Sequence, residues 1–335
     1  MMRRRCLLRG VVLLVVAIIP TVIYLLLPQG IPALDAALGE FINVRRVDVF
    51  DFYDTKGEER CFNLNRGIIS TDTIPKVVHV IWLSPELTFI NYLTVKSALI
   101  SIMPDNLFFH YTTLNETNQW FRKLYGNITL VRHDLAQEYS RPIRENWNIA
   151  HVADALRLDI IQQFGGIYFD MDMIVLRSFD NLLQSDRDIV LGNEGGDRRG
   201  LCNGVVIGRK NSSFLQRWID SYSSFSPKEW NYHSVVYPKL LSLRYPQEIC
   251  ALSPVAFFWP TWTKRHVQYM HEPITEEEAQ DLQHTLAINE GSLYPNQLAY
   301  HAWSHPSRAY LESLTPGIVK TQNTRFNILV RRFVD

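Results

Sequence analysis

The fold of this chain is decided by residues 164–172, which read Phe-Gly-Gly-Ile-Tyr-Phe-Asp-Met-Asp. The apolar run predicts a short buried strand that ends at Phe169. Positions i and i+2 of a strand point to the same side, so Asp170 and Asp172 would present two carboxylates together where the strand leaves the core. Hard divalent cations such as Mg²⁺ and Mn²⁺ prefer oxygen ligands and often share them with substrate phosphates. The stretch therefore predicts a metal and diphosphate site.

A helix is predicted immediately upstream, over residues 148–164. Its apolar positions recur every four residues, which is helical periodicity; they are Val152, Leu156, Ile160 and Phe164. Gly165 and Gly166 supply the backbone freedom that a helix stop needs. Asp154 and Arg157 are three positions apart and share another face of the helix. From that face an arginine would neutralise a diphosphate, and an aspartate would accept hydrogen bonds from sugar hydroxyls.

A bare Asp-x-Asp pair is common, and by itself it is more typical of a solvated strand end than of a metal site. The longer string is more specific, because residues 153–157 read Ala-Asp-Ala-Leu-Arg and residues 165–172 carry the glycine pair, tyrosine and both aspartates. This string resembles the sugar-binding region of DXD glycosyltransferases of family 32. Their relatives include yeast-type α-mannosyltransferases, α1,4-galactosyltransferase-like enzymes and the glucosyltransferase domains of clostridial toxins. The resemblance covers residues 74–307.

Three further residues lie in segments that share this resemblance. Trp82 ends a run that looks like the family's opening strand, where a tryptophan of the toxin relatives stacks on the donor base; core packing is the alternative. Asn203 lies in a segment similar to the Asn-Gly strand that borders the donor-sugar and acceptor pocket. His301 belongs to a His-x-Trp element that resembles one near the end of the galactosyltransferase-like members, and it would complete the metal shell. The alternative for His301 is an ordinary polar histidine.

The chain also departs from the family pattern. Ala153 stands where many members have serine, and Leu158 follows the arginine where yeast-type members often have tyrosine. The Ser-x-Trp terminus of the toxin type is absent, which leaves the last metal ligand open. The charged residues are not affected.

The resemblance implies a metal-dependent retaining glycosyltransferase, a hexosyltransferase with a GT-A type, Rossmann-like, mixed and mainly parallel α/β sheet flanked by helices. It implies Mn²⁺ or Mg²⁺ as cofactor, a UDP- or GDP-hexose as donor, and a glycan, glycolipid or glycoprotein hydroxyl that receives an α-linkage. The implied metal ligands are Asp170, Asp172 and His301. The implied donor-binding residues are Trp82, Asp154, Arg157, Tyr168, Asp170 and Asn203, and the implied catalytic residues are Asp170, Asp172 and Arg157. No residue is indicated as a covalent nucleophile.

Strand and helix patterns alternate along the chain from Ile74 onward. Strands are predicted over residues 77–82, 107–111, 128–132, 167–169, 189–191 and 205–207, and helices over residues 90–103 and 149–164. Such alternation is typical of a mainly parallel α/β sheet, which binds its ligands at the carboxyl ends of the strands. Trp82 and the two aspartates lie at such ends, so the topology agrees with the predicted chemistry.

The N-terminus predicts a membrane anchor. Arg3-Arg4-Arg5 precedes an uncharged apolar run over residues 11–27, and basic residues on the short side of a span favour the cytosol. We expect a cytosolic tail over residues 1–6, a transmembrane signal anchor over 7–27, a stem over 28–70 with a short helix near 34–43, and a luminal catalytic domain over 71–335. This predicts a single-pass type II protein of the Golgi membrane. A cleaved secretory signal is the alternative.

Composition excludes a nucleic-acid-binding protein, because the 335 residues carry a formal net charge of zero and show no basic patch. Sequons occur at Asn115, Asn127 and Asn211, and a luminal domain predicts that one or more is glycosylated. The cysteines are Cys6, Cys61, Cys202 and Cys250. Three would be luminal, an odd number that leaves one unpaired in a monomer; a bond between Cys202 and Cys250 is a guess that the sequence does not settle.

Several readings remain open from the sequence. A catalytically silent glycan- or nucleotide-binding homologue and a metal-dependent phosphohydrolase would also carry paired aspartates. Glu194 either reaches the active site or caps a loop. The aromatic residues of 230–234 and 257–262 form either an acceptor cleft or a buried wall of the core.

Overall fold

A computed structural model of the chain describes residues 54–63, 73–138 and 147–335. The chain divides into two compact units, Met1–Arg45 and Arg46–Asp335, and the first lies outside the described residues. The predicted anchor and the predicted helix near residues 34–43 therefore lie outside them as well. Within the described ranges, no helix is both long and apolar enough to cross a membrane.

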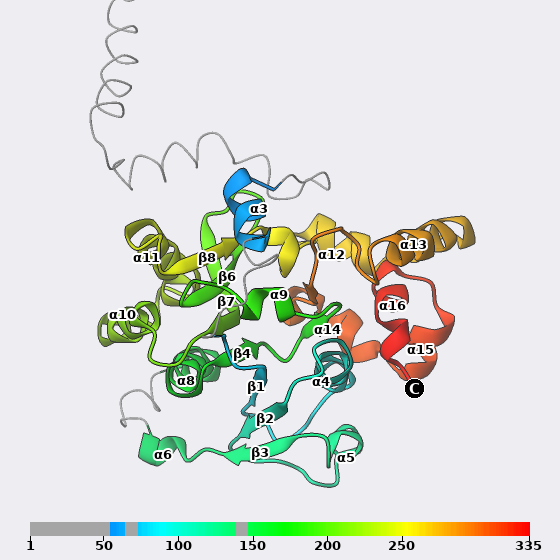
Figure 1. The fold of residues 1–335 in the computed structure, drawn as a ribbon. Helices are drawn as coiled ribbons and strands as arrows, with labels where there is room; N and C mark the ends of the chain where they lie inside the picture. The colour runs from blue at the N-terminus through cyan, green and yellow to red at the C-terminus, as the bar shows by residue number, and fades with distance from the viewer. Residues whose placement is uncertain (1–53, 64–72, 139–146) are drawn as a thin grey trace, which may run out of the picture. The chain divides into compact units, whose positions relative to one another are not determined.

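The centre of the described chain is a seven-stranded sheet with strand order β3-β2-β1-β4-β7-β6-β8 (Figure 1). Its strands are β1 (Val77–Trp82), β2 (Asn106–Tyr111), β3 (Thr129–Arg132), β4 (Gly166–Phe169), β6 (Ile189–Glu194), β7 (Gly200–Gly208) and β8 (Ile249–Leu252). Strand β7 runs antiparallel to both of its neighbours, and the other pairs are parallel. A small second sheet pairs β5 (Met173–Val175) with β9 (Ala299–His301) in antiparallel register. The predicted mixed, mainly parallel α/β sheet is confirmed.

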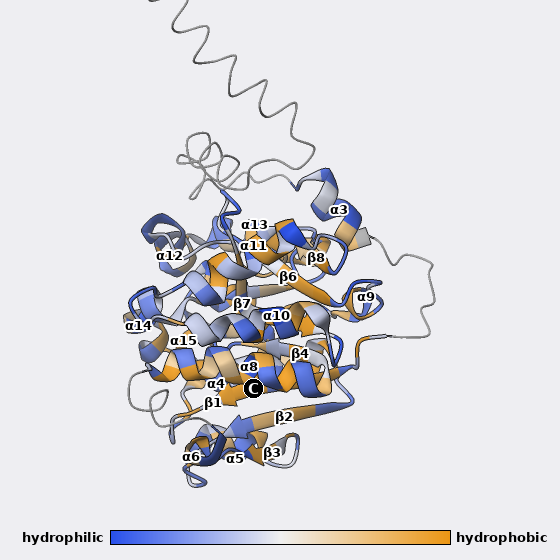
Figure 2. Cartoon of the chain, turned by 90° about the vertical axis from the view of Figure 1, so that its left-hand side faces the viewer, coloured by the Kyte–Doolittle hydropathy of each residue, from blue (hydrophilic) through white to orange (hydrophobic). Residues whose placement is uncertain are grey.

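Helices flank the sheet, and two apolar clusters form the core. The helices are α3 (Lys56–Asn63), α4 (Phe89–Ser101), α5 (Gln119–Leu124), α6 (Leu135–Glu138), α8 (Ile149–Phe164), α9 (Asp180–Leu183), α10 (Ser213–Ser221), α11 (Tyr237–Arg244), α12 (Lys264–His271), α13 (Glu276–Ile288), α14 (Ser304–Ser313), α15 (Pro316–Thr321) and α16 (Arg325–Val330). Ile167 and Phe169 of β4 belong to one cluster and Tyr168 to the other, as expected when successive side chains of a strand point to opposite faces. In Figure 2, helix α8 alternates between hydrophobic and hydrophilic colours, as a helix covering a sheet should.

The turn from α8 into β4 depends on the glycine pair. The side chain of Asn148 caps the start of α8 by accepting a hydrogen bond from the N–H of Ala150. Gly165 has φ of +68° and Gly166 has φ of +105°, in the left-handed region that side chains disfavour. A Cβ atom on Gly166 would lie 2.7 Å from the carbonyl oxygen of Val77 in β1. The predicted helix stop is therefore confirmed, and the second glycine also lets β4 lie beside β1.

The described part of the predicted stem is joined to the sheet by a disulfide. Cys61 of α3 is bonded to Cys250 of β8, with a Cα–Cα distance of 5.6 Å. The guess that Cys202 pairs with Cys250 is wrong, and Cys202 is a buried free thiol. The reason is topological, because β6 lies between β7 and β8. Two strand spacings add up to roughly 9.5 Å, which exceeds the Cα–Cα distance that a disulfide can span. The domain boundaries themselves stay a prediction.

A buried ion pair also holds α3 on the domain. The carboxylate of Glu58, only 5% exposed, receives hydrogen bonds from the guanidinium of Arg198, one of them 2.9 Å long. Asn193 near the end of β6 accepts a hydrogen bond of 2.7 Å from Lys239. Burial lowers the pKa of Lys239 to about 8. Helix α3 therefore contacts the loop that follows β6 as well as β8.

The three sequons differ in exposure. Asn127 and Asn211 are exposed, whereas Asn115 is half-buried and its amide donates a hydrogen bond of 2.6 Å to Glu86. Glycosylation of these residues stays a prediction.

Candidate active site

A cleft of about 560 Å³ opens at the carboxyl ends of β1 and β4. Its lining includes Trp82, Arg157, Tyr168, Asp170 and Asp172, which the sequence had singled out. These residues come from two neighbouring parallel strands and from α8, which packs against them. The residues therefore lie together at the edge of the sheet where a parallel α/β fold binds its ligands, and their role in binding stays a prediction.

The two aspartates meet a histidine from the far end of the chain. Strand β9 pairs with β5, which directly follows Asp172, and the register places Met173 opposite His301. The Nε2 atom of His301 lies 3.1 Å from Oδ1 of Asp172 and 3.9 Å from Oδ2 of Asp170. One ligand atom from each of the three residues lies within 4.8 Å of the others. The structure therefore brings the three predicted metal ligands together.

The chemistry of this group fits a divalent cation. Two carboxylates and an imidazole form the oxygen-rich donor set that suits Mn²⁺ or Mg²⁺. His301 is only 8% exposed, and its Nδ1 atom has no hydrogen-bond partner among the described residues. The backbone N–H of Ser304 donates a hydrogen bond of 2.8 Å to Oδ2 of Asp172, which fixes the orientation of that carboxylate.

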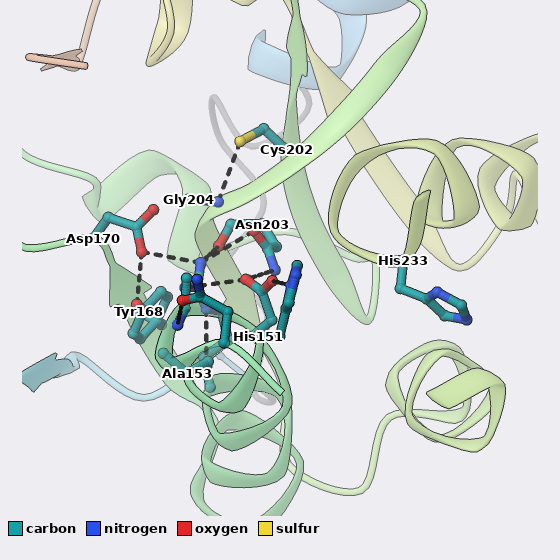
Figure 3. Close-up of polar contacts among 12 residues, drawn as sticks. His151, Ala153, Tyr168, Asp170, Cys202, Asn203, Gly204 and His233 are labelled. Carbon is teal, nitrogen blue, oxygen red and sulfur yellow. Dashed lines mark hydrogen bonds and ion pairs between the residues drawn. The ribbon is translucent and has the colours of Figure 1, made fainter. Parts of the chain in front are cut away.

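A buried guanidinium, that of Arg157, holds the other side of the site. Figure 3 shows the polar contacts in this region around the labelled residues Tyr168, Asp170 and Asn203. Arg157 lies 3.0 Å from Oδ1 of Asp170 and 3.2 Å from Oδ1 of Asp154. It also donates a hydrogen bond of 2.9 Å to the carbonyl oxygen of Asn203, and it lies 4.5 Å from the ring centre of Tyr168. Three oxygen atoms, from Asp154, Asp170 and Asn203, and the ring of Tyr168 thus surround the Arg157 guanidinium. Arg157 is only 5% exposed.

Further hydrogen bonds close this network. The Tyr168 hydroxyl donates a hydrogen bond of 2.7 Å to Oδ1 of Asp170, and the Asn203 amide donates one of 2.8 Å to Oδ1 of Asp154. The predicted common face of Asp154 and Arg157 is therefore confirmed. Their main contacts are to protein groups.

The charges set the pKa values of the cluster. Burial raises the pKa of Asp170, and the nearby Arg157 offsets this only in part. Burial would also raise the pKa of Asp172, but His301 and the N–H of Ser304 outweigh it and hold that pKa well below its usual range. For His301, burial opposes the charged form, whereas Asp172 outweighs it and raises the pKa. Asp172 and His301 therefore each favour the charged form of the other.

The predicted donor-binding residues divide into two groups. Trp82 is half-buried at the cleft and donates a hydrogen bond of 3.0 Å from Nε1 to the carbonyl of Glu86, so one ring face is held beside the opening. Asp154 and Asn203 are 9% and 4% exposed, and they are not among the described residues that line the cleft. Both instead contact Arg157, which does line the cleft.

Three residues at the site were missed from the sequence. Asn91 of α4 is buried and donates a hydrogen bond of 2.8 Å to the carbonyl of Met171, between the two aspartates. Ser304 caps Asp172 as described above. Arg308, one turn later on α14, is exposed and lines the cleft. The only available signal was the nearness of Ser304 and Arg308 to the His-x-Trp element.

The open questions on Glu194 and the aromatic segments are partly resolved. The Oε2 atom of Glu194 is buried without a hydrogen-bond partner among the described residues, and burial raises its pKa. Phe257, Phe258 and Trp259 are fully buried and form a wall of the core. Trp230, in contrast, is 64% exposed.

Comparison with known proteins decides the family. The family model described as "Glycosyltransferase sugar-binding region containing DXD motif" matches residues 92–188. Glucan organizing enzyme 1 of Cryptococcus neoformans var. grubii serotype A is 34% identical over 277 residues, which are 78% of this chain and 71% of that protein. The chain belongs to the DXD glycosyltransferases. It is a transferase enzyme of this family, as the motif predicted.

More distant relatives agree with this assignment. Lactosylceramide 4-alpha-galactosyltransferase of Mus musculus is 25% identical over 229 residues, 62% of this chain and 57% of that protein. A solved structure of the PaToxG glycosyltransferase covers 90% of this chain with 16% identity and a TM-score of 0.39, a likeness too distant to support an argument. Neither alternative, a silent binding homologue or a phosphohydrolase, is supported by these relatives.

The network around Arg157 predicts a strong stability coupling. Arg157→Met should lower the free energy of unfolding by about 3 kcal/mol, because it leaves the buried Asp154 and the half-buried Asp170 carboxylates without their cation. Adding Asp154→Asn should recover about 1 kcal/mol or more, because one uncompensated charge is removed. Urea unfolding followed by circular dichroism measures both changes.

Arg244→Met is the matched control, because Arg244 is exposed on α11. It should change the free energy of unfolding by less than about 0.5 kcal/mol. A cost for Arg157→Met as small as that of the control, or no recovery in the double variant, would contradict the buried network.

Proposed function

We propose that this glycosyltransferase is metal-dependent and retaining, and that it moves a hexose from a nucleotide sugar to a hydroxyl of a glycan or glycolipid, forming an α-linkage. The observation that carries the proposal is the grouping of Asp170, Asp172 and His301 beside a cleft that Trp82 and Arg157 also line or support. A flat aromatic side chain suits a planar base, and a carboxylate-rich centre suits a diphosphate with its cation.

The donor is proposed to lie across the cleft from Trp82 to the aspartates. The base of a UDP- or GDP-hexose stacks on Trp82, and the diphosphate lies toward Asp170 and Asp172. Arg308 is an exposed cation among the residues that line the cleft, and in this proposal it contacts the diphosphate. Asp170, Asp172 and His301 would hold a divalent cation, Mn²⁺ or Mg²⁺. When bound, this cation would supply positive charge to stabilise the leaving group.

Arg157 has a positioning role in this proposal. Its guanidinium donates to Asp154, Asp170 and Asn203, so it fixes the carboxylate that faces the donor. Direct contact of Arg157 or Asp154 with the donor sugar stays a prediction, as does contact of Tyr168 and Asn203. Because both partners of Asp170 are buried, the carboxylate does not reorganise as charge develops nearby.

The proposal of retention rests on the family resemblance, and the carboxylates of the cleft bear only on how it would occur. Asp170 is bonded to Arg157 and Tyr168, and Asp172 to His301 and Ser304, so each carboxylate already has protein partners. Neither is well suited to form a bond to the sugar carbon. Given retention, we propose a transfer without a covalent intermediate, in which the leaving group departs and the acceptor attacks on the same face of the sugar.

The proposed location is the lumen of the Golgi, on a single-pass type II anchor over residues 7–27. The apolar run after three arginines supports the anchor. The bond between Cys61 and Cys250 supports a luminal domain, because disulfides persist in oxidising compartments.

Metal dependence is tested with Asp172→Asn. The variant keeps an acceptor for the N–H of Ser304, so the fold should persist, but Mn²⁺ affinity should fall by at least about 10- to 100-fold, because loss of a charged ligand costs more than loss of a group that only orients a ligand. The first measurement is the melting temperature of wild type and variant with UDP, GDP, UDP-hexoses and GDP-hexoses, each with and without Mn²⁺. The second is the rate at which each protein hydrolyses the donor. Full wild-type activity in excess chelator would contradict the proposal.

The role of Arg308 is tested with Arg308→Gln. We expect about a tenfold weaker binding of UDP or GDP, equal to about 1.4 kcal/mol, because a charged hydrogen bond to phosphate is lost. Isothermal titration in the presence of Mn²⁺ measures it. Arg308→Lys should retain most of the affinity and Arg244→Gln all of it; equal affinities for Arg308→Gln and wild type would remove Arg308 from the donor site.

A further inference from the structure

A row of aromatic rings lies beside the start of α8. The ring centres of Trp147 and Phe225 are 4.1 Å apart, those of Phe225 and His151 are 5.0 Å apart, and those of His151 and Trp230 are 4.8 Å apart. We call these four residues the aromatic strip. They come from two segments distant in sequence, so the fold assembles the strip.

The strip presents flat ring surface to solvent. Trp230 is 64% exposed, and Trp147 and Phe225 are half-buried, whereas His151 is 2% exposed beneath them. Tryptophan combines a large apolar face with a polar edge, and one left this exposed beside other rings is typical of a contact surface. The neighbouring polar residues Asn148, Glu229 and Asn231 are also exposed.

The base of the strip is rigid. His233 packs against Phe225 and Tyr222, with ring centres 5.4 Å and 5.0 Å away, and its Nε2 atom is 3.0 Å from the carbonyl of Ser221. It lies in the π-helix η2 (Tyr232–Val236), a conformation that is rare and often found at functional sites. The segment that carries Trp230 is therefore held in place.

The strip contacts the polar network that supports the candidate active site. The Nδ1 atom of His151 lies 3.5 Å from Oδ2 of Asp154, which in turn is paired with Arg157. In Figure 3, His151 lies on the side of the polar network that faces His233, and Asp170 lies on the other side. The same first turns of α8 line the donor cleft through Ile149, Ala150 and Ala153.

We propose that the aromatic strip binds the acceptor glycan, with a pyranose ring stacked on Trp230. This rests on the proposed function, because it gives the second substrate of that reaction a place beside α8, whose first turns also line the donor cleft. The apolar face of a sugar ring matches an indole, and Asn148, Glu229 and Asn231 supply hydrogen-bond partners for its hydroxyls. Only Trp230 of the four rings is largely exposed, which is too little surface for a stable protein interface, since such an interface buries about 800 Å² on each partner.

The test is saturation-transfer NMR on the full chain with methyl β-lactoside, mannobiose and laminaribiose as probes. At least one probe should receive saturation from wild type, and Trp230→Ala should reduce that signal about fivefold or more. Trp230→Phe should retain most of it, because the aromatic face remains. Tyr125→Ala is the matched control, since Tyr125 is an aromatic residue that is 69% exposed near α5, and it should leave the signal unchanged.

The donor side is measured separately. Trp230→Ala should raise the KM for an acceptor and leave Mn²⁺-dependent UDP or GDP binding and the KM for the donor unchanged. If wild type does not bind UDP or GDP in the presence of Mn²⁺, the proposed function itself fails. Intact nucleotide binding with no saturation transfer to any of the three probes, or with equal transfer in Trp230→Ala, would overturn the strip as the acceptor site.

Discussion

One buried guanidinium organises this structure. Arg157 lies between the carboxylates of Asp154 and Asp170, and both are close enough to offset the cost of burying its charge. The interaction stabilises charges that would otherwise be costly to bury. It also fixes the position of Asp170, half of the motif from which the family takes its name.

The topology of the sheet brings the residues of this network and their neighbours together. The glycine pair at the start of β4 lets the strand lie against β1, so that the aspartates emerge beside Trp82. Strand β7 carries Asn203 to Arg157, and β9 returns from the far end of the chain to place His301 beside Asp172. Each contribution comes from a different part of the sequence, and the enzyme's charge distribution depends on all of them.

Local features of the fold and site could be predicted from the sequence, and long-range ones could not. Periodicity gave α8 and β4, and helical spacing placed Asp154 and Arg157 on one face. The antiparallel direction of β7 could not be predicted, because an apolar run does not specify direction. Arg308 and the bond from Cys61 to Cys250 were missed for a similar reason, since each depends on pairing between remote segments. His301 was found only through the family resemblance.

The central claim is that the charges fixed by this network form a cation site shared with the donor diphosphate. Anomalous diffraction at the manganese edge, from crystals grown with Mn²⁺ and UDP, tests it most directly. We expect one strong peak within coordinating distance of Asp170, Asp172 and His301, in contact with the diphosphate. UDP bound in the cleft with no manganese between it and these side chains would contradict the account.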